Sequence, residues 1–120
     1  MVPSSFDVDA LLGSIEILRE GDQHPSEVFA AAGANGVSDE DLVAAVRSAL
    51  QERPDLVRTW QNWSYDKRWT PSPFLDGLKV GHYDAGEHHL RRYTTEVEAC
   101  ADFVLAEVRW VLDRRVIERS

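Results

Sequence analysis

The side chains best suited to binding gather between positions 60 and 74, in the stretch WQNWSYDKRWTPSPF. It holds three of the four tryptophans, one of the three tyrosines and two of the five prolines. Tryptophan, tyrosine and arginine carry much of the binding energy at protein interfaces, but such rings also fill cores where helices meet a sheet. The sequence leaves both interpretations open. The candidate binding residues are Trp60, Trp63, Tyr65, Asp66, Arg68, Trp69 and Phe74.

Three histidines, His82, His88 and His89, lie close to Asp84 and Glu87. Imidazole and carboxylate groups both bind divalent metals, but this spacing matches no metal motif, and adjacent histidines on a strand point to opposite sides. We therefore expect no metal and no cofactor. The alternative is a small-molecule-binding protein or an enzyme, with a pocket lined by Trp63, Tyr65, Asp66, Trp69, His82 and Tyr83.

Cys100, the only cysteine, falls on the apolar stripe of an expected helix. A buried thiol behaves as a small core residue and is unreactive. The chain has no glycine-rich phosphate loop and no nucleophile elbow, so we expect a protein without catalysis. The single cysteine, the absence of a signal sequence at the start and the lack of a long apolar run predict a cytoplasmic protein that does not bind membranes.

Charge is distributed unevenly along the chain. Residues 1–57 contain eleven acidic and three basic residues and carry the whole formal net charge of −8, whereas residues 58–120 contain ten of each. An acidic surface repels phosphates and anionic lipids, and it attracts a basic protein if its charges share a face. The alternative is that these acids are scattered over a solvated surface and serve solubility.

Residues 26–50 superficially resemble a DNA-binding helix-turn-helix, with an alanine-rich first helix, a glycine turn and a periodic second helix. In such motifs the first residues of the second helix contact base edges beside phosphates. Here those residues are Asp39, Glu40 and Asp41, which the phosphates would repel. We expect no nucleic-acid binding, and we assign these three residues to an acidic surface.

The N-terminal half is predicted to be helical. Residues 7–20 have leucines and isoleucine at helical spacing, with a short strand around Ile15 as the competing assignment. Pro25 opens a short helix that ends before Gly33, and Ser38 caps the next one. Pro54 ends that helix near residue 53 and can open a further turn bearing Leu56, Val57 and Trp60.

Residues 78–84 and 88–94 are predicted to form an antiparallel hairpin. We prefer a three-residue loop with a bulge at Gly86, because this register puts Leu78, Val80, His82 and Leu90 on one face. Residues 68–75 can add an edge strand and make the sheet three-stranded.

A capping box at Thr95 begins the longest helix, of about 20 residues. Its broad apolar stripe indicates packing on the hairpin and on the N-terminal helices. Phe103 and Trp110 widen the apolar surface and offer an interface for a homodimer, which is a further alternative.

These features together predict one α+β domain over residues 1–120: N-terminal helical segments, a central hairpin or three-stranded sheet, and a long C-terminal helix packed on it. Its partner is expected to be another protein, with a basic one favoured by charge. In size, acidity and lack of catalytic motifs the chain is similar to immunity and antitoxin proteins, a likeness of type without a shared motif. Its eleven arginines against two lysines fit a GC-rich bacterial gene.

Overall fold

The computed structural model describes residues 3–66, 72–82 and 90–114, and it confirms the α+β class. Within these ranges, five α helices and one 3-10 helix precede a three-stranded antiparallel sheet, which a sixth α helix follows. Their bounds are α1 Val8–Leu12, α2 Ser14–Glu20, α3 Pro25–Ala31, η1 Ala34–Gly36, α4 Asp39–Glu52, α5 Asp55–Asp66, β1 Pro73–Asp76, β2 Lys79–His82, β3 Arg91–Arg92 and α6 Glu96–Asp113.

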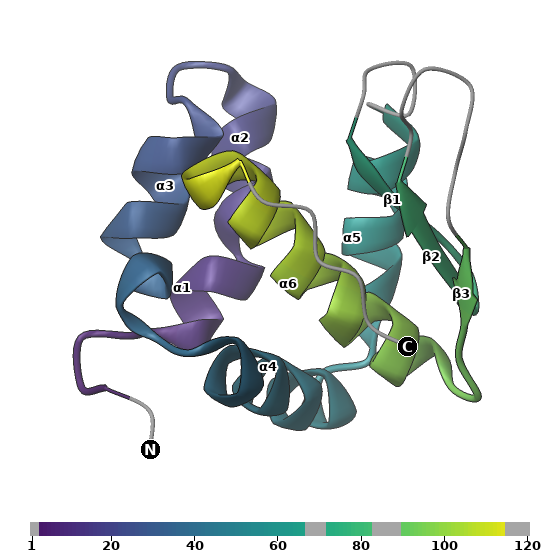
Figure 1. Cartoon of the computed structure of the whole chain (residues 1–120). Helices are drawn as coiled ribbons and strands as arrows, with labels where there is room; N and C mark the ends of the chain where they lie inside the picture. Colours follow the sequence, from purple (N-terminus) through teal and green to yellow (C-terminus); the bar gives the residue numbers. More distant parts are fainter. Residues whose placement is uncertain (1–2, 67–71, 83–89, 115–120) are drawn as a thin grey trace.

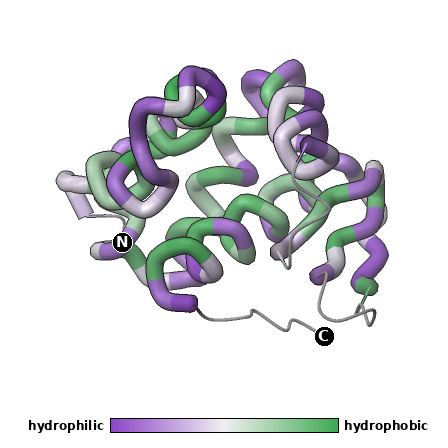
Figure 2. Tube along the Cα trace, turned by 90° about the horizontal axis from the view of Figure 1, so that it is seen from above, coloured by the Kyte–Doolittle hydropathy of each residue, from purple (hydrophilic) through white to green (hydrophobic). Residues whose placement is uncertain are grey.

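Helix α6 runs through the middle of the molecule, with α1, α2 and α3 on one side, α5 and the sheet on the other, and α4 across the bottom (Figure 1). It contacts α3, α4, α5, β1 and β2. Every residue from 99 to 109 on this helix is buried. The hydropathy colouring shows it as one of the most apolar segments of the chain (Figure 2). A helix enclosed in this way organises the core, because each neighbouring element buries its apolar face against it.

The helical prediction for residues 7–20 is confirmed, but the segment is divided at Gly13 into α1 and α2. The Asp7 side chain caps α1 by accepting a hydrogen bond from the backbone N–H of Ala10. At the division, the hydroxyl of Ser14 donates to the carbonyl of Leu11 at 2.6 Å. Gly21, at a φ of 81°, ends α2 in the left-handed conformation that glycine adopts readily.

The cap residues chosen from the sequence are also confirmed. Pro25 is the first residue of α3, the Ser38 hydroxyl accepts from the backbone N–H of Asp41 at 3.2 Å, and Thr95 accepts from that of Glu98 at 3.1 Å. Helix α5 is much longer than the single turn expected after Pro54, since it continues for 12 residues. Its apolar side chains pack against the core, which extends the helix beyond what the local signals indicated.

The sheet has the order β1-β2-β3, so β1 supplies the expected additional edge strand. A hairpin absent from the prediction joins β1 to β2 through Gly77 and Leu78, with Gly77 at a φ of 60°. Glycine adopts a positive φ readily, so Gly77 allows the chain to reverse direction in a two-residue turn. The expected loop at residues 84–87 lies outside the described residues.

The predicted register between the second and third strands is wrong. Val80 faces Arg91, so by the alternation of a strand Leu90 lies on the opposite side of the sheet from Val80. Val80 is fully buried, whereas Leu90 is 53% exposed and Leu78, in the turn, is 40% exposed. The inward position opposite Val80 is taken by Arg91, whose Nε lies 3.8 Å from Oδ2 of the buried Asp102 on α6. An ion pair with the central helix thus replaces the expected apolar contact.

Trp60 joins both sides of the core. Its ring is fully buried and packs on Phe29 of α3, with ring centroids 6.5 Å apart, and edge-on to Phe103 of α6, at 6.2 Å. The indole N–H donates to the carbonyl of Leu12 at 3.1 Å. This bond satisfies the single polar group of the ring and connects α5 with the end of α1.

Gly33 and Gly21 have the same φ of 81° but different surroundings. A Cβ on Gly33 would lie 2.9 Å from the Cα of Phe6 and closer still to the carbonyl of Ser5, while a Cβ on Gly21 would have no neighbour within 4 Å. We expect Gly21→Ala to cost roughly 1 to 2 kcal/mol, for backbone strain alone. Gly33→Ala should cost about 2 kcal/mol more, because the chain before α1 must move. Urea unfolding measures both, and equal losses would contradict the close approach.

Candidate interaction surface

The acidic residues of the first half lie almost entirely at the surface. Nine of the eleven acids within residues 1–57 are exposed, and the other two, Asp39 and Asp41, are partly buried. All but Asp55 lie on α1 to α4 or on the segments that cap and connect them. Helices α1 to α4, with their caps and connections, therefore hold ten acids against three bases, and we call them the acidic helical side.

The three acids at the start of α4 differ in their surroundings. Glu40 is exposed, and Asp41 lies partly buried in the first turn, where a negative charge is favourable to the helix dipole. Asp39 accepts a hydrogen bond from Nε of Arg109 at 2.6 Å. The Asp39 carboxylate thus has a partner within the protein, and Glu40 is the member of the group most open to another molecule.

Arg109 on α6 was not identified from the sequence, yet it holds the start of α4 in place. It is only 4% exposed, and its Nη1 and Nη2 donate to the carbonyls of Ala34 at 3.0 Å and Val37 at 2.6 Å. Nη1 also lies 3.9 Å from the carboxylate of Asp113. Buried charges require such partners, and the planar guanidinium can serve several acceptors at once. No local pattern indicates this role, because all of these partners except Asp113 are at least 70 residues away in the sequence.

Two of the candidate aromatic residues belong to the core. Trp60 is fully buried, and Phe74 on β1 is only 8% exposed. A surface role for these two rings is therefore wrong: apolar rings of this size contribute most when they are removed from water. Arg68 and Trp69, also candidates, lie outside the described residues.

The remaining candidates lie at the C-terminal end of α5. Trp63 is partly buried and its indole N–H donates to Oε2 of Glu107 at 3.1 Å. The Tyr65 hydroxyl donates to Oδ1 of Asp76 in β1 at 2.9 Å. Asp66 is exposed and pairs with Arg19 of α2 at 3.7 Å. The exposed part of the aromatic segment in the described structure is thus this end of α5.

Two residues of the proposed small-molecule pocket, Trp63 and His82, contact neighbouring positions on α6. Trp63 contacts Glu107, and His82 packs edge-on to Trp110 with ring centroids 4.9 Å apart. Glu107 and Trp110 are three residues apart on α6 and so share one face of the helix. Tyr83 and Trp69 lie outside the described residues. Glu107, a carboxylate that is 1% exposed, was not identified from the sequence, because charged residues are rarely fully buried and are expected on the solvent face of a helix.

Phe103 and Trp110 were expected to offer a homodimer interface, and for Phe103 this expectation is wrong. Phe103 is fully buried against Trp60, so its ring cannot contact a second copy. Trp110 is partly buried and packs on His82. The additional apolar surface of the helix is thus used inside the domain, because α5 and the sheet cover it.

Within the described ranges, no group of three or more histidine, cysteine, aspartate or glutamate side chains is arranged to hold a metal ion. His88, His89, Asp84 and Glu87 fall outside these ranges. None of the helices in the described part of the chain combines the length and the apolar character needed to cross a bilayer.

The comparisons with other proteins identify no relative. No protein-family model matches the chain, and neither the curated proteins nor the solved structures contain a significant match. The surface must therefore be interpreted from its own residues.

Arg109→Met tests the attachment of α4 to α6. The variant leaves the Ala34 and Val37 carbonyls without their donor and Asp39 without its counter-charge, so we expect the free energy of unfolding to fall by about 3 kcal/mol. Asp39→Asn retains a side-chain oxygen that can accept from Arg109, and it should cost about 1 kcal/mol. Urea unfolding of both variants gives the difference. Similar losses would contradict the importance of the two carbonyl contacts.

Cys100 is buried on α6, and this burial raises the pKa of its thiol to about 12. At pH 8 the thiolate fraction is then on the order of 10⁻⁴, so a thiol reagent should label the native protein only through unfolding. Labelling followed by mass spectrometry should show complete reaction in denaturant and very slow reaction in buffer. Rapid labelling of the folded protein would contradict this assignment.

Proposed function

We propose that this protein is a small binding module without catalysis, and that it engages a basic protein through its acidic helical side. The observation that carries the proposal is the exposure of nine of the eleven acids in residues 1–57, a segment with only three bases. Charges held on the outside of packed helices act on an approaching partner, since few of them are neutralised within the fold.

Electrostatics selects the class of partner. A negative surface speeds the diffusional encounter with a positive one and opposes phosphate backbones and anionic lipids. This argument favours a basic protein over nucleic acid or membrane.

The end of α5 supplies a second element of the surface. Tyr65 presents a ring whose hydroxyl is fixed by Asp76, and Asp66 lies next to it with its carboxylate exposed. A fixed aromatic ring beside an exposed charge is common among residues that contribute strongly to interfaces. Asp66 also pairs with Arg19 of α2, so this end of α5 is continuous with the acidic helices. We infer that one partner can contact both.

The likeness to immunity and antitoxin proteins follows from this surface. Such proteins neutralise a toxin by covering it, which requires a rigid body of complementary charge and no chemistry of its own. Under this proposal the partner is a basic toxin and the acidic helices form the contact. The assignment to this type rests on charge and size.

A small-molecule site is the second candidate, and one observation favours it. Trp63 and His82 both pack on the same face of α6, beside the buried carboxylate of Glu107. Aromatic side chains with a few polar groups are typical of ligand pockets. A small molecule that shifts the NMR resonances of both Trp63 and His82 would favour a ligand-binding function over protein binding.

Two double variants test the main proposal at equal net charge. Glu20→Gln with Glu27→Gln removes two exposed charges from α2 and α3, while Glu96→Gln with Glu98→Gln removes two from the start of α6. Because only the position of the charge differs, the first variant should capture less of a basic partner than the second. The measurement is affinity capture from the source organism at low salt, with the captured proteins identified by mass spectrometry and their association rates compared.

The expected partner has a basic sequence, and its association with the wild-type protein slows as salt is added. Circular dichroism confirms that each variant is folded. The proposal fails if both variants bind the partner equally well, or if the captured protein is acidic and its binding is independent of salt.

A further inference from the structure

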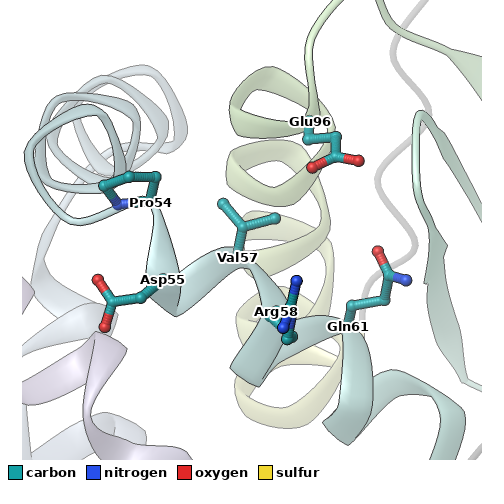
Figure 3. Close-up of a pocket in the computed structure, with 6 residues that line it drawn as sticks. All are labelled: Pro54, Asp55, Val57, Arg58, Gln61 and Glu96. Atoms are coloured by element: carbon teal, nitrogen blue, oxygen red, sulfur yellow. The ribbon is translucent and has the colours of Figure 1, made fainter.

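A cleft opens where α4 ends and both α5 and α6 begin. It has a volume of about 480 Å³ and is lined by Pro54, Asp55, Val57, Arg58, Gln61 and Glu96. The first five come from α5 and the residue before it, while Glu96 is the first residue of α6 (Figure 3). This size is within the range of small-ligand sites. The cleft is separate from the side chains Trp63 and His82 discussed above, because none of those residues lines it.

Two opposite charges face the same space. Figure 3 shows the Glu96 carboxylate in the upper part of the cleft and the Arg58 side chain, seen nearly end-on, in the lower part, with Val57 to one side of both. The Asp55 carboxylate is directed away from Glu96. A positive and a negative group on opposite walls make the cleft complementary to a molecule that carries both charges.

Arg58 and Glu96 do not neutralise each other. Neither side chain makes a hydrogen bond or an ion pair with another described residue, so the charged atoms of Arg58 and Glu96 are more than 4.0 Å apart. They belong to two helices whose positions are fixed by the core, since Val57 and Trp60 of α5 and Ala99 of α6 are buried. The fold therefore fixes the backbone positions of Arg58 and Glu96, while their exposed side chains can turn toward a ligand.

The walls between these charges are held in place. The Gln61 side chain accepts a hydrogen bond from the backbone N–H of Gly77 at 3.2 Å and donates one to the Tyr65 hydroxyl at 3.1 Å. Val57 is 6% exposed and provides an apolar wall. A site with fixed walls loses little conformational freedom when a ligand binds.

From this geometry we propose that the cleft binds a small zwitterion, with its carboxylate on Arg58, its ammonium group on Glu96 and its hydrocarbon part against Val57. The chemical class is the amino acids, in which the two charges are carried by one short chain. Both contacts are charge-assisted hydrogen bonds, which are stronger than neutral ones. The proposal does not depend on the acidic surface, because a free small molecule occupies the cleft.

A series of ω-amino acids measures the distance that the ligand must span. Glycine, β-alanine, 4-aminobutyrate and 6-aminohexanoate carry the same two charges at increasing separation, and butylamine and butyrate each carry one. In ¹H–¹⁵N NMR titrations of the full chain at low salt, at least one zwitterion should shift the amide resonances of Val57, Arg58 and Gln61. It should bind about fivefold more tightly than either singly charged compound, the factor that corresponds to roughly 1 kcal/mol for an exposed ion pair.

Charge exchange distinguishes this site from general electrostatics. Arg58→Glu should abolish binding of the preferred zwitterion, and Arg58→Glu combined with Glu96→Arg should restore it, because the exchanged pair accepts the ligand in the reverse orientation. Glu52→Gln with Arg53→Gln is the matched control, since it removes one exposed acid and one exposed base beside the cleft and should leave binding unchanged.

Two results would overturn the proposal. One is that no zwitterion shifts the amide resonances at the cleft, even at about a 50-fold molar excess of ligand over protein. An excess of this order is needed because ligands of a few atoms bind weakly. The other is binding that persists in Arg58→Glu, or that butylamine or butyrate matches in affinity. Neither result bears on the capture of a basic protein, so the two proposals fail separately.

Discussion

The structure depends on α6, a helix enclosed on nearly all sides, whose buried charges must be satisfied within the fold. Arg109 binds two carbonyls before α4 together with Asp39, Asp102 binds the hydroxyl of Tyr93 and lies close to Arg91 at the start of β3, and Glu107 accepts from Trp63 of α5. An unpaired charge at these positions would cost several kcal/mol. The three residues therefore specify which elements approach the helix and in which register.

This arrangement also explains the separation of charge. The core is shared between both halves through Trp60 and α6, so the acidic helices need no basic face to pack against the sheet. Apolar contacts hold the two sides together, and the acids remain on the outside. The acidic side chains repel one another only weakly, because solvent and salt screen exposed charges. The apolar contacts that hold the fold together are buried and are not weakened by this repulsion.

Elements with strong local signals were predictable. Ser38 and Thr95 cap the helices that follow them, and Pro25 opens α3, because these residues act on backbone groups a few positions away. The sheet register was not predictable in this way. Alternation of apolar residues favoured a register with Leu90 on the same face as Val80, but the position opposite Val80 is taken by Arg91, whose counter-charge is on α6. Distant contacts also decided which candidate aromatic residues are core and which are partly exposed. Trp60, for example, is buried because it packs on Phe29 and on α6.

The amino-acid sequence by itself determined the class of the fold, the ends of most helices, the inert position of Cys100 and the excess of acid in the first half. These follow from composition, periodicity and contacts between near neighbours, all of which act locally along the chain. Only the tertiary structure decided which aromatic rings are core, which carboxylates are paired, and that Arg58 and Glu96 face one cleft. Those outcomes arise from residues far apart in sequence, where packing and desolvation override local preference.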